Sequence, residues 1–250
     1  GLNVRRRFPL NVYYRFYFPK LFARYDKIIY LDSDTVVLKS LRTLWNTEIS
    51  GKFVAGVQAR EFVFANRRLG LPPKNKYINA GVMLLNLKEW RKNGLSKKCL
   101  EYTRAHKPYG QDQDTLNILC LDKIKIIDPR WNAQVFSNSR KIAETFPRFF
   151  ESLDTPYIIH FLTQQKPWHP HAPRFDKTHY YFDYLKLTPW KKSLYSYWFQ
   201  RIILQIHFSS SLKIIRFFYI PILKTFREQI YFLGIPLTKN YDPHWKTDKK

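Results

Sequence analysis

The first strong secondary-structure signal in the chain is a short apolar run, Ile28-Ile29-Tyr30-Leu31, which follows Lys27 and ends at Asp32. An uninterrupted apolar run of this length predicts a β-strand that is buried on both faces, as in a parallel sheet. The segment before it, residues 13–22, is predicted to be a helix that leads into this strand.

A second buried strand is predicted at residues 81–85, where Gly81-Val82-Met83-Leu84-Leu85 has no polar side chain. A helix is expected to begin directly after it, at Asn86. Further along the chain we expect one more helix and two short strands, at residues 112–121, 123–127 and 157–161. Strands that alternate with helices in this way indicate an α/β domain.

The composition changes after about Thr188. Between Lys186 and Arg227 there are eight Lys and Arg residues and no Asp or Glu, and aromatic and aliphatic residues lie between them. Six apolar positions fall on one face of a helix: Tyr195, Trp198, Phe199, Ile202, Ile203 and Ile206. We therefore predict two parts, an α/β domain of residues 1–188 and a basic, aromatic, helical region of residues 189–250.

The composition narrows the class of partner. Of the 250 residues, 45% are hydrophobic and 18% aromatic, which indicates a folded chain. The formal charge is +24, so an anionic partner is expected: a nucleic acid, an anionic membrane surface or a phosphorylated substrate. No recognisable nucleic-acid motif accompanies the charge, which argues against a nucleic acid. No apolar run approaches the roughly 20 residues of a membrane span.

The candidate chemistry begins at Asp32-Ser33-Asp34, at the end of the first apolar strand. Ligands of open α/β sheets bind at the carboxyl ends of the strands. Two carboxylates one residue apart can share a divalent cation there, and the cation can bridge to the phosphates of a nucleotide. A polar turn at the strand end is the alternative interpretation.

The same triplet also suits a phosphatase of the haloacid-dehalogenase type, in which Asp32 would be phosphorylated and Asp34 would act as the acid/base. That family also needs a later acidic pair that binds metal. This chain has no Asp-Asp dipeptide and no obvious substitute for it after a glycine. The phosphatase therefore lacks one of the motifs that its chemistry needs, and it stands as the alternative to a nucleotide-binding metal site.

The ordered segments along the chain resemble those of the family 8 glycosyltransferases, especially the bacterial lipopolysaccharide galactosyl- and glucosyltransferases. The resemblance covers residues 13–168. It is carried, in order, by Arg24–Asp34, Tyr77–Leu87, Gln111–Asp114, and His160-Phe161 with Lys166-Pro167-Trp168.

This resemblance implies a Rossmann-like nucleotide-diphospho-sugar transferase fold (GT-A). It also implies a UDP-galactose or UDP-glucose donor, transfer with retention of configuration, and a Mn²⁺ ion, with Mg²⁺ as the alternative. The metal ligands would be Asp32, Asp34 and His160, and two carboxylates with one imidazole suit Mn²⁺ well. Considered alone, His160 would be an ordinary histidine at a strand end.

The resemblance also assigns the donor and catalytic residues. The donor is expected to contact Arg15, Asp32, Ser33, Asp34, Asn79, Ala80, Gly81, Gln111 and Lys166. Asp112, Gln113 and Asp114 are expected to act at the anomeric carbon. Retention needs either a nucleophile or front-face attack, and no nucleophile is assigned. The alternatives are that Asp112 or Asp114 only caps a helix, that Arg15 lies on the surface, and that Lys166 is solvated.

Two features depart from the family pattern. Thr163 stands where the family has a glycine, three residues after the histidine, and its side chain is expected either to crowd the diphosphate or to change the loop. The chain also begins inside the region that follows the family's first nucleotide-binding strands, so we expect an N-terminally truncated sheet with exposed edges.

The expected function is transfer of a hexose to a lipopolysaccharide-type, lipid-linked glycan. Basic and aromatic residues of the region 189–250 are expected to hold the protein on an anionic membrane surface, peripheral at the cytoplasmic face of the plasma membrane. A helical cap packed on the sheet is the alternative for this region. An inactive, membrane-binding remnant is the alternative for the whole chain.

Overall fold

The computed structural model describes residues 10–135, 147–162, 166–169, 177–192 and five strands between 204 and 236. The chain forms two compact units, residues 1–164 with 175–177, and residues 165–174 with 178–250. The predicted boundary at residue 188 falls inside the second unit.

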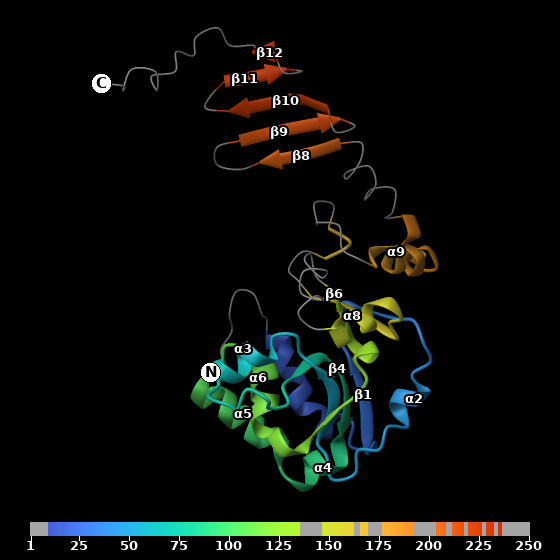
Figure 1. Cartoon of the computed structure of the whole chain (residues 1–250), viewed down its shortest axis with the longest axis vertical. Coiled ribbons are helices and arrows are strands. Elements are labelled where there is room, and N and C mark those ends of the chain that lie inside the picture. The colour runs from blue at the N-terminus through green and yellow to red at the C-terminus, as the bar shows by residue number, and fades with distance from the viewer. Residues whose placement is uncertain are drawn as a thin grey trace, which may run out of the picture. The chain divides into compact units, whose positions relative to one another are not determined.

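A four-stranded mixed sheet forms the centre of the first unit, in the order β1-β4-β3-β5 (Figure 1). These strands are β1 (Lys27–Leu31), β4 (Ile78–Asn86), β3 (Val54–Gln58) and β5 (Ile124–Ile126). β4 runs antiparallel to both β1 and β3, and β3 runs parallel to β5. β4 is an inner strand of this sheet, and eight of its nine residues are buried, in line with the apolar run of residues 81–85 within it.

The prediction that β1 is buried on both faces of a parallel sheet is wrong. Among the described strands β1 is the outermost of its sheet, it pairs antiparallel with β4, and all five of its residues are only partly buried. An apolar run predicts that a strand forms, but its place in the sheet depends on partners far along the chain.

A smaller sheet lies beside the first, in the order β2-β7-β6. It consists of β2 (Thr35–Val37), β7 (Ile158–Phe161) and β6 (Ala133–Val135). β7 runs antiparallel to β2, with His160 opposite Thr35, and parallel to β6. The predicted strands at 123–127 and 157–161 are thus confirmed as β5 and β7.

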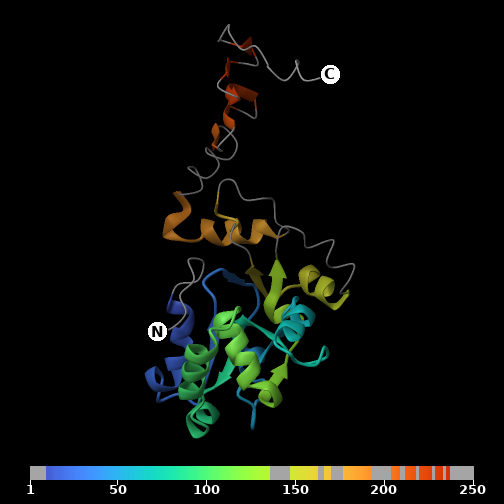
Figure 2. The same cartoon turned by 90° about the vertical axis from the view of Figure 1, so that its left-hand side faces the viewer.

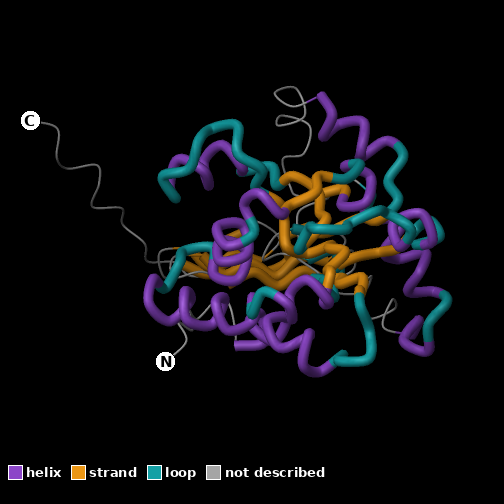
Figure 3. Tube along the Cα trace, turned by 90° about the horizontal axis from the view of Figure 1, so that it is seen from below, coloured by secondary structure: helices purple, strands orange, loops and turns teal. Residues whose placement is uncertain are grey.

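Apolar clusters cover both faces of the main sheet. On one face, β4 side chains pack against the 3-10 helix η1 (Leu10–Tyr17) and helices α4 (Leu87–Lys92), α5 (Leu95–His106) and α6 (Gln111–Leu119). In Figures 2 and 3 these helices run along one side of the strands. On the other face, Val82 and Leu84 pack with Trp131 and Ile158. The fold is therefore layered around β4.

The predicted helix starts are confirmed in part. α4 begins after Asn86, whose side chain accepts a hydrogen bond from the Glu89 N–H (3.1 Å), as expected of an N-cap. The N-cap of α6 is Gly110, so neither Asp112 nor Asp114 occupies the capping position. Asp114 nevertheless accepts a hydrogen bond from the Gly110 N–H at the start of the helix. The predicted helix at 13–22 is present as η1 followed by α1 (Phe18–Leu21).

The remaining helices are short. They are α2 (Arg42–Trp45), α3 (Phe62–Arg68), η2 (Leu121–Lys123), η3 (Pro129–Asn132), α8 (Pro147–Asp154), α9 (Thr178–Lys186) and η4 (Pro189–Lys192). No helix in the described ranges combines the length and the apolar content of a membrane span.

The second unit ends in an antiparallel meander of the order β12-β11-β10-β9-β8 (Figure 1). Its strands are β8 (Leu204–Phe208), β9 (Leu212–Phe217), β10 (Ile220–Phe226), β11 (Gln229–Phe232) and β12 (Ile235–Pro236). The helix predicted up to Ile206 is therefore wrong from Leu204 onwards, and its earlier part, 195–203, lies outside the described residues. Leu204-Gln205-Ile206-His207-Phe208 alternates apolar and polar residues, which is the period of a strand.

Candidate active site

Three side chains with metal-binding atoms meet between the two sheets. Asp32 and Asp34 lie in the turn from β1 to β2, and His160 lies on β7 next to β2. Backbone hydrogen bonds hold the turn in place. The Asp32 N–H donates to the Gly81 carbonyl (2.7 Å), and the Asp34 carbonyl accepts from the Phe161 N–H (3.0 Å).

The geometry of this cluster suits one divalent cation. Nε2 of His160 lies 3.2 Å from Oδ1 of Asp34 and 3.7 Å from Oδ2 of Asp32, and one ligand atom from each residue falls within 4.8 Å of the others. His160 is buried, whereas the Asp32 and Asp34 side chains are 31% and 18% exposed. Two carboxylates and an imidazole can hold a cation at such separations. The structure thus brings the three predicted ligands together.

Gly81 lets the backbone of β4 pass directly beneath this cluster. A Cβ atom at this position would lie 2.1 Å from Cε1 of His160 and 2.8 Å from Oδ2 of Asp32. Neither side chain could keep its place beside an alanine, because real Cβ atoms do not approach so closely. The absence of a side chain at Gly81 therefore leaves room for two of the three metal-ligand candidates.

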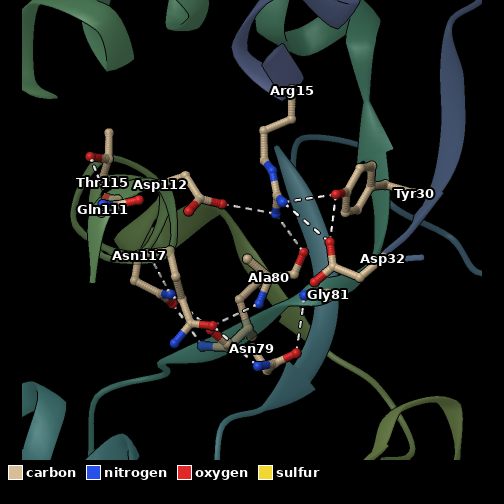
Figure 4. A network of polar contacts seen from close by, with 12 residues as sticks. Arg15, Tyr30, Asp32, Asn79, Ala80, Gly81, Gln111, Asp112, Thr115 and Asn117 are labelled. Atoms are coloured by element: carbon tan, nitrogen blue, oxygen red, sulfur yellow. Dashed lines mark hydrogen bonds and ion pairs between the residues drawn. The ribbon is translucent and has the colours of Figure 1, made fainter. Parts of the chain in front are cut away.

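Arg15 is the centre of a buried polar network next to the cluster (Figure 4). Its Nη1 donates to the Ala80 carbonyl (2.7 Å) and pairs with Oδ2 of Asp112 (2.9 Å). Its Nη2 donates to the Tyr30 hydroxyl (2.8 Å) and to Oδ1 of Asp32 (3.3 Å). The side chain is only 6% exposed, so the alternative of a surface arginine is wrong.

Tyr30 is a site residue that the sequence interpretation missed. Its hydroxyl donates to Oδ1 of Asp32 (2.5 Å) and accepts from Arg15, and burial raises the pKa of the phenol. Its signal was available, because positions two apart on a strand share a face, and Tyr30 stands two residues before Asp32.

Asp112 is a buried carboxylate on the first turn of α6, and Arg15 is its ion-pair partner. Burial raises the pKa of the Asp112 carboxyl to about 6, against the opposing effect of Arg15 and with a further contribution from the charge of Asp32. A carboxylate with such a pKa is largely ionised at neutral pH but protonates easily.

Gln113 links α6 to the loop end of β4. Its Oε1 accepts from the Ala80 N–H (3.0 Å) and from Nδ2 of Asn79 (3.2 Å), while its Nε2 donates to Oε1 of Glu61 (3.1 Å) and to the Tyr77 hydroxyl (3.1 Å). The amide is therefore held at both ends. Gln113 and Asn79, which were predicted separately, belong to one network.

Asp114 has different surroundings from Asp112. Its carboxylate is fully buried and accepts two hydrogen bonds from Arg68 (2.7 Å each), one from the Tyr77 hydroxyl (2.6 Å) and one from the Gly110 N–H (2.6 Å). Burial alone would raise its pKa, but these donors outweigh it and hold the pKa of Asp114 below the ordinary value. Its predicted catalytic role stays a prediction, and its contacts favour an anchoring role for the start of α6.

Replacing Asp114 with asparagine is expected to lower the free energy of unfolding by about 3 kcal/mol at pH 7, because Arg68 loses its buried partner. The asparagine NH₂ group would also face the N–H donors. A carboxyl whose pKa is lower in the folded than in the unfolded state stabilises the fold at pH values above its unfolded pKa of about 4. This contribution to the free energy of unfolding is lost as the pH falls through the folded pKa. Urea unfolding should therefore show the deficit at pH 7, and the deficit should shrink below pH 4.

Asp128→Asn is the matched control, since Asp128 also pairs with an arginine, Arg130, but both side chains are 36% exposed. An exposed pair should change the unfolding free energy by less than about 1 kcal/mol. Equal losses at the two positions would contradict the anchoring role of Asp114.

The remaining predicted residues have separate positions. Gln111 is buried at the start of α6 with φ +52°, and neither atom of its amide has a hydrogen-bond partner among the described residues. Ser33 is exposed between the two aspartates. Lys166 belongs to the second unit, where its N–H donates to Nδ1 of His169 (3.2 Å), and its donor contact stays a prediction. Thr163 lies outside the described residues.

The fold of the described residues is the GT-A architecture of glycosyltransferases. The sequence profile of Glycosyl transferase family 8 matches residues 3–172, and the chain belongs to that family. This membership rejects the phosphatase alternative and confirms the resemblance.

Two similar proteins are named for their activity on lipopolysaccharide. Lipopolysaccharide 1,2-glucosyltransferase of Escherichia coli is 31% identical over 75% of this chain and 58% of its own length. Lipopolysaccharide 1,3-galactosyltransferase of Salmonella typhimurium is 26% identical over 76% of this chain and 58% of its own length. General stress protein A of Bacillus subtilis is 30% identical over 71% of this chain and 65% of its own length. The chain thus spans about 58–65% of these relatives.

A solved structure of the galactosyltransferase LgtC in complex with donor and acceptor sugar analogs is 27% identical and superposes with a TM-score of 0.59. The match covers 69% of this chain and 66% of that one. The bifunctional glycosyltransferase WbbM superposes with a TM-score of 0.67 over 77% of this chain and 38% of its own, at 24% identity, which supports the fold alone.

Proposed function

We propose that this chain forms the metal- and sugar-binding part of a retaining hexosyltransferase. The donor would be UDP-galactose or UDP-glucose, and the acceptor a lipopolysaccharide-type, lipid-linked glycan. One observation carries the proposal: Asp32, Asp34 and His160 converge with their ligand atoms within 4.8 Å of one another, above a glycine that leaves them room.

The donor set fits Mn²⁺ best, with Mg²⁺ as the alternative, because an imidazole nitrogen joins two carboxylate oxygens. When bound, the ion would supply Lewis-acid stabilisation of the diphosphate leaving group. Asp32, Asp34 and His160 would hold it. Lys166 is proposed to add positive charge near the diphosphate.

The chain's own residues would bind and orient the donor sugar. The buried Arg15 guanidinium fixes the carboxylates of Asp32 and Asp112 relative to each other, so the cation side and the sugar side of the site move together. Gln113 and Asn79 hold the Ala80-Gly81 backbone, where the sugar would lie. Asp112 is proposed as the main carboxylate contact of the sugar. No nucleophile is assigned.

We also propose that the region 189–250 binds an anionic membrane surface and places the protein at the cytoplasmic face. Eight basic residues and no acidic ones occur between Lys186 and Arg227, and each basic residue near an anionic surface contributes about 1 kcal/mol. Sedimentation with anionic and neutral vesicles measures this binding. Equal binding to both would contradict an electrostatic attachment.

The metal site is tested by titrating the chain with Mn²⁺ and following the free ion by electron paramagnetic resonance. Asp34→Asn removes one ligand, so the Mn²⁺ affinity of this variant is expected to fall at least about 100-fold. Loss of a residue that only supports a ligand costs up to about 100-fold, and loss of a ligand itself should cost no less. The rate of UDP release from the UDP-sugar should fall in parallel.

Asp26→Asn is the matched control. Asp26 stands directly before β1, whereas Asp32 stands directly after it. The Asp26 side chain is 71% exposed and is paired with Arg91. This variant removes the same charge at the opposite end of the strand and should bind Mn²⁺ like the wild type. If Asp34→Asn also binds like the wild type, the metal assignment is wrong.

A further inference from the structure

Buried amides beneath the metal-ligand cluster form a chain of hydrogen bonds whose direction can be deduced. A backbone N–H can only donate, so the Asn79 atom that faces the Gly81 N–H (3.0 Å) must be its oxygen, Oδ1. The NH₂ group of Asn79 then faces Gln113. Oε1 of Gln113 also accepts from a backbone donor, the Ala80 N–H (3.0 Å), and therefore can accept from Asn79 (3.2 Å). Two independent backbone amides thus fix both orientations.

This direction determines the orientation of Asn132, at the end of η3. Oδ1 of Asn79 lies 2.9 Å from Asn132 and can only accept, so the NH₂ group of Asn132 points to it. The carbonyl oxygen of Asn132 must then face Nδ1 of His160, at 3.1 Å. An amide oxygen only accepts, and therefore Nδ1 of His160 carries the proton.

In a neutral ring, a proton on Nδ1 leaves the lone pair on Nε2, the other ring nitrogen of His160. Nε2 is the atom that faces Oδ1 of Asp34 (3.2 Å) and Oδ2 of Asp32 (3.7 Å). A neutral imidazole with a free Nε2 is the form that binds a metal ion. Asn132 and His160 are each 1% exposed, so the contact between them is shielded from solvent.

The position of Asn132 is itself well supported. Trp131, the preceding residue, packs edge to face on Tyr157 with ring centroids 4.8 Å apart. The Tyr157 N–H donates to the Arg130 carbonyl (2.8 Å), which ties η3 to the segment that leads into β7. Asn132 and His160 are therefore held by neighbouring, mutually bonded segments.

We propose that Asn132 is a positioning residue that holds His160 in the Nδ1–H form, directs Nε2 at the cation, and couples the metal ligand to Asn79 and Gln113 on the sugar side. This inference rests on the metal site proposed above. Nothing in the local sequence around Asn132 distinguishes it from an ordinary buried amide. Its role emerges only from the contacts across 53 residues to Asn79 and 28 residues to His160.

The protonation form is measured directly, without metal, by long-range ¹⁵N–¹H correlation of the imidazole rings. The chain has seven histidines, and His160→Gln identifies the signals of His160 by their loss. The wild type is expected to show the Nδ1–H form. In Asn132→Leu, which removes both hydrogen bonds, the population should shift toward the Nε2–H form. A ring that carries a proton on Nε2 and none on Nδ1 in the wild type would overturn the proposal.

Metal affinity provides the second readout. Asn132→Leu is expected to weaken Mn²⁺ binding by about 10–100-fold, the usual effect of losing a residue that supports a ligand. Asn132→Asp keeps an acceptor for the Nδ1 proton and should recover the Nδ1–H form and part of the affinity. Wild-type affinity and protonation form in Asn132→Leu would overturn the proposal.

Asn66→Leu controls for loss of a buried amide. Asn66 is buried on α3, where its NH₂ group donates to the Pro73 and Asn75 carbonyls, away from the cluster. It should lower thermal stability like Asn132→Leu but leave the His160 signals and Mn²⁺ affinity unchanged. A wild-type chain that binds no Mn²⁺ would overturn the metal assignment itself. A wrong protonation form in a chain that binds Mn²⁺ would overturn only the role of Asn132.

Discussion

Replacing Gly81 with alanine is expected to lower Mn²⁺ affinity at least about 100-fold. Loss of one residue that supports a ligand costs about 10–100-fold, and this substitution displaces two ligands. The new Cβ would lie 2.1 Å from Cε1 and 2.7 Å from Nδ1 of His160, and 2.8 Å from Oδ2 of Asp32. The Gly81 carbonyl accepts from the Asp32 N–H, and the Gly81 N–H donates to the Asn79 side chain. These bonds hold the backbone of β4 at this point, so the two ligands are expected to move instead. Electron paramagnetic resonance of free Mn²⁺ measures the loss.

Gly56→Ala separates this effect from general overpacking. Gly56 lies on the neighbouring strand β3, where a Cβ would meet the tip of the Ile78 side chain, Cδ1, at 2.9 Å. Both substitutions are expected to lower the free energy of unfolding by about 1–3 kcal/mol. Only Gly81→Ala should lose Mn²⁺ binding. Equal Mn²⁺ affinities in the two variants would contradict the position of the cluster above Gly81.

Replacing Arg15 with methionine is expected to have the largest effect on stability, about 3–5 kcal/mol at pH 7, because it leaves the buried Asp112 carboxylate without its cation. The Ala80 carbonyl would also lose its donor. The pKa of Asp112, already raised to about 6 by burial, should rise further because Arg15 no longer opposes the effect of burial. UDP release should become undetectable, since Asp32 and Asp112 would no longer be held together.

The pH dependence of this loss has a defined sign. When the folded pKa of a carboxyl exceeds its unfolded value of about 4, the folded state is favoured by protonation, and stability falls as the pH rises through that interval. In Arg15→Met the interval extends to higher pH, so lowering the pH from 7 to 5 in metal-free buffer should recover part of the stability. Urea unfolding at both pH values measures this.

Two further variants complete the test of Arg15. Adding Asp112→Asn to Arg15→Met removes the buried charge, so stability at pH 7 should largely return while UDP release stays lost. Arg91→Met breaks a more exposed ion pair, with Asp26, and should cost about 0–1 kcal/mol. If Arg15→Met is no more destabilising than Arg91→Met, the buried network around Arg15 is not as described.

The sequence by itself determined the class of fold and the location of the chemistry. The apolar runs gave β1, β4, β5 and β7, because side-chain pattern reports burial within a few residues. The order of the four family segments placed the acidic turn, the Asn79–Gly81 segment and His160 in one site. The resemblance thereby identified the three metal-ligand candidates that the structure brings together.

Only the tertiary structure decided how the site is built. It placed β1 at the edge of the described sheet and showed that the C-terminal region forms strands from Leu204. It also distinguished the partly exposed carboxylates of Asp32 and Asp34 from the fully buried carboxylate of Asp114, which is paired with Arg68. It also added Tyr30 and Asn132 to the site. The physical reason is that strand pairing, desolvation and the direction of a hydrogen bond depend on groups tens of residues apart, whereas a local pattern carries only the period and polarity of its own segment.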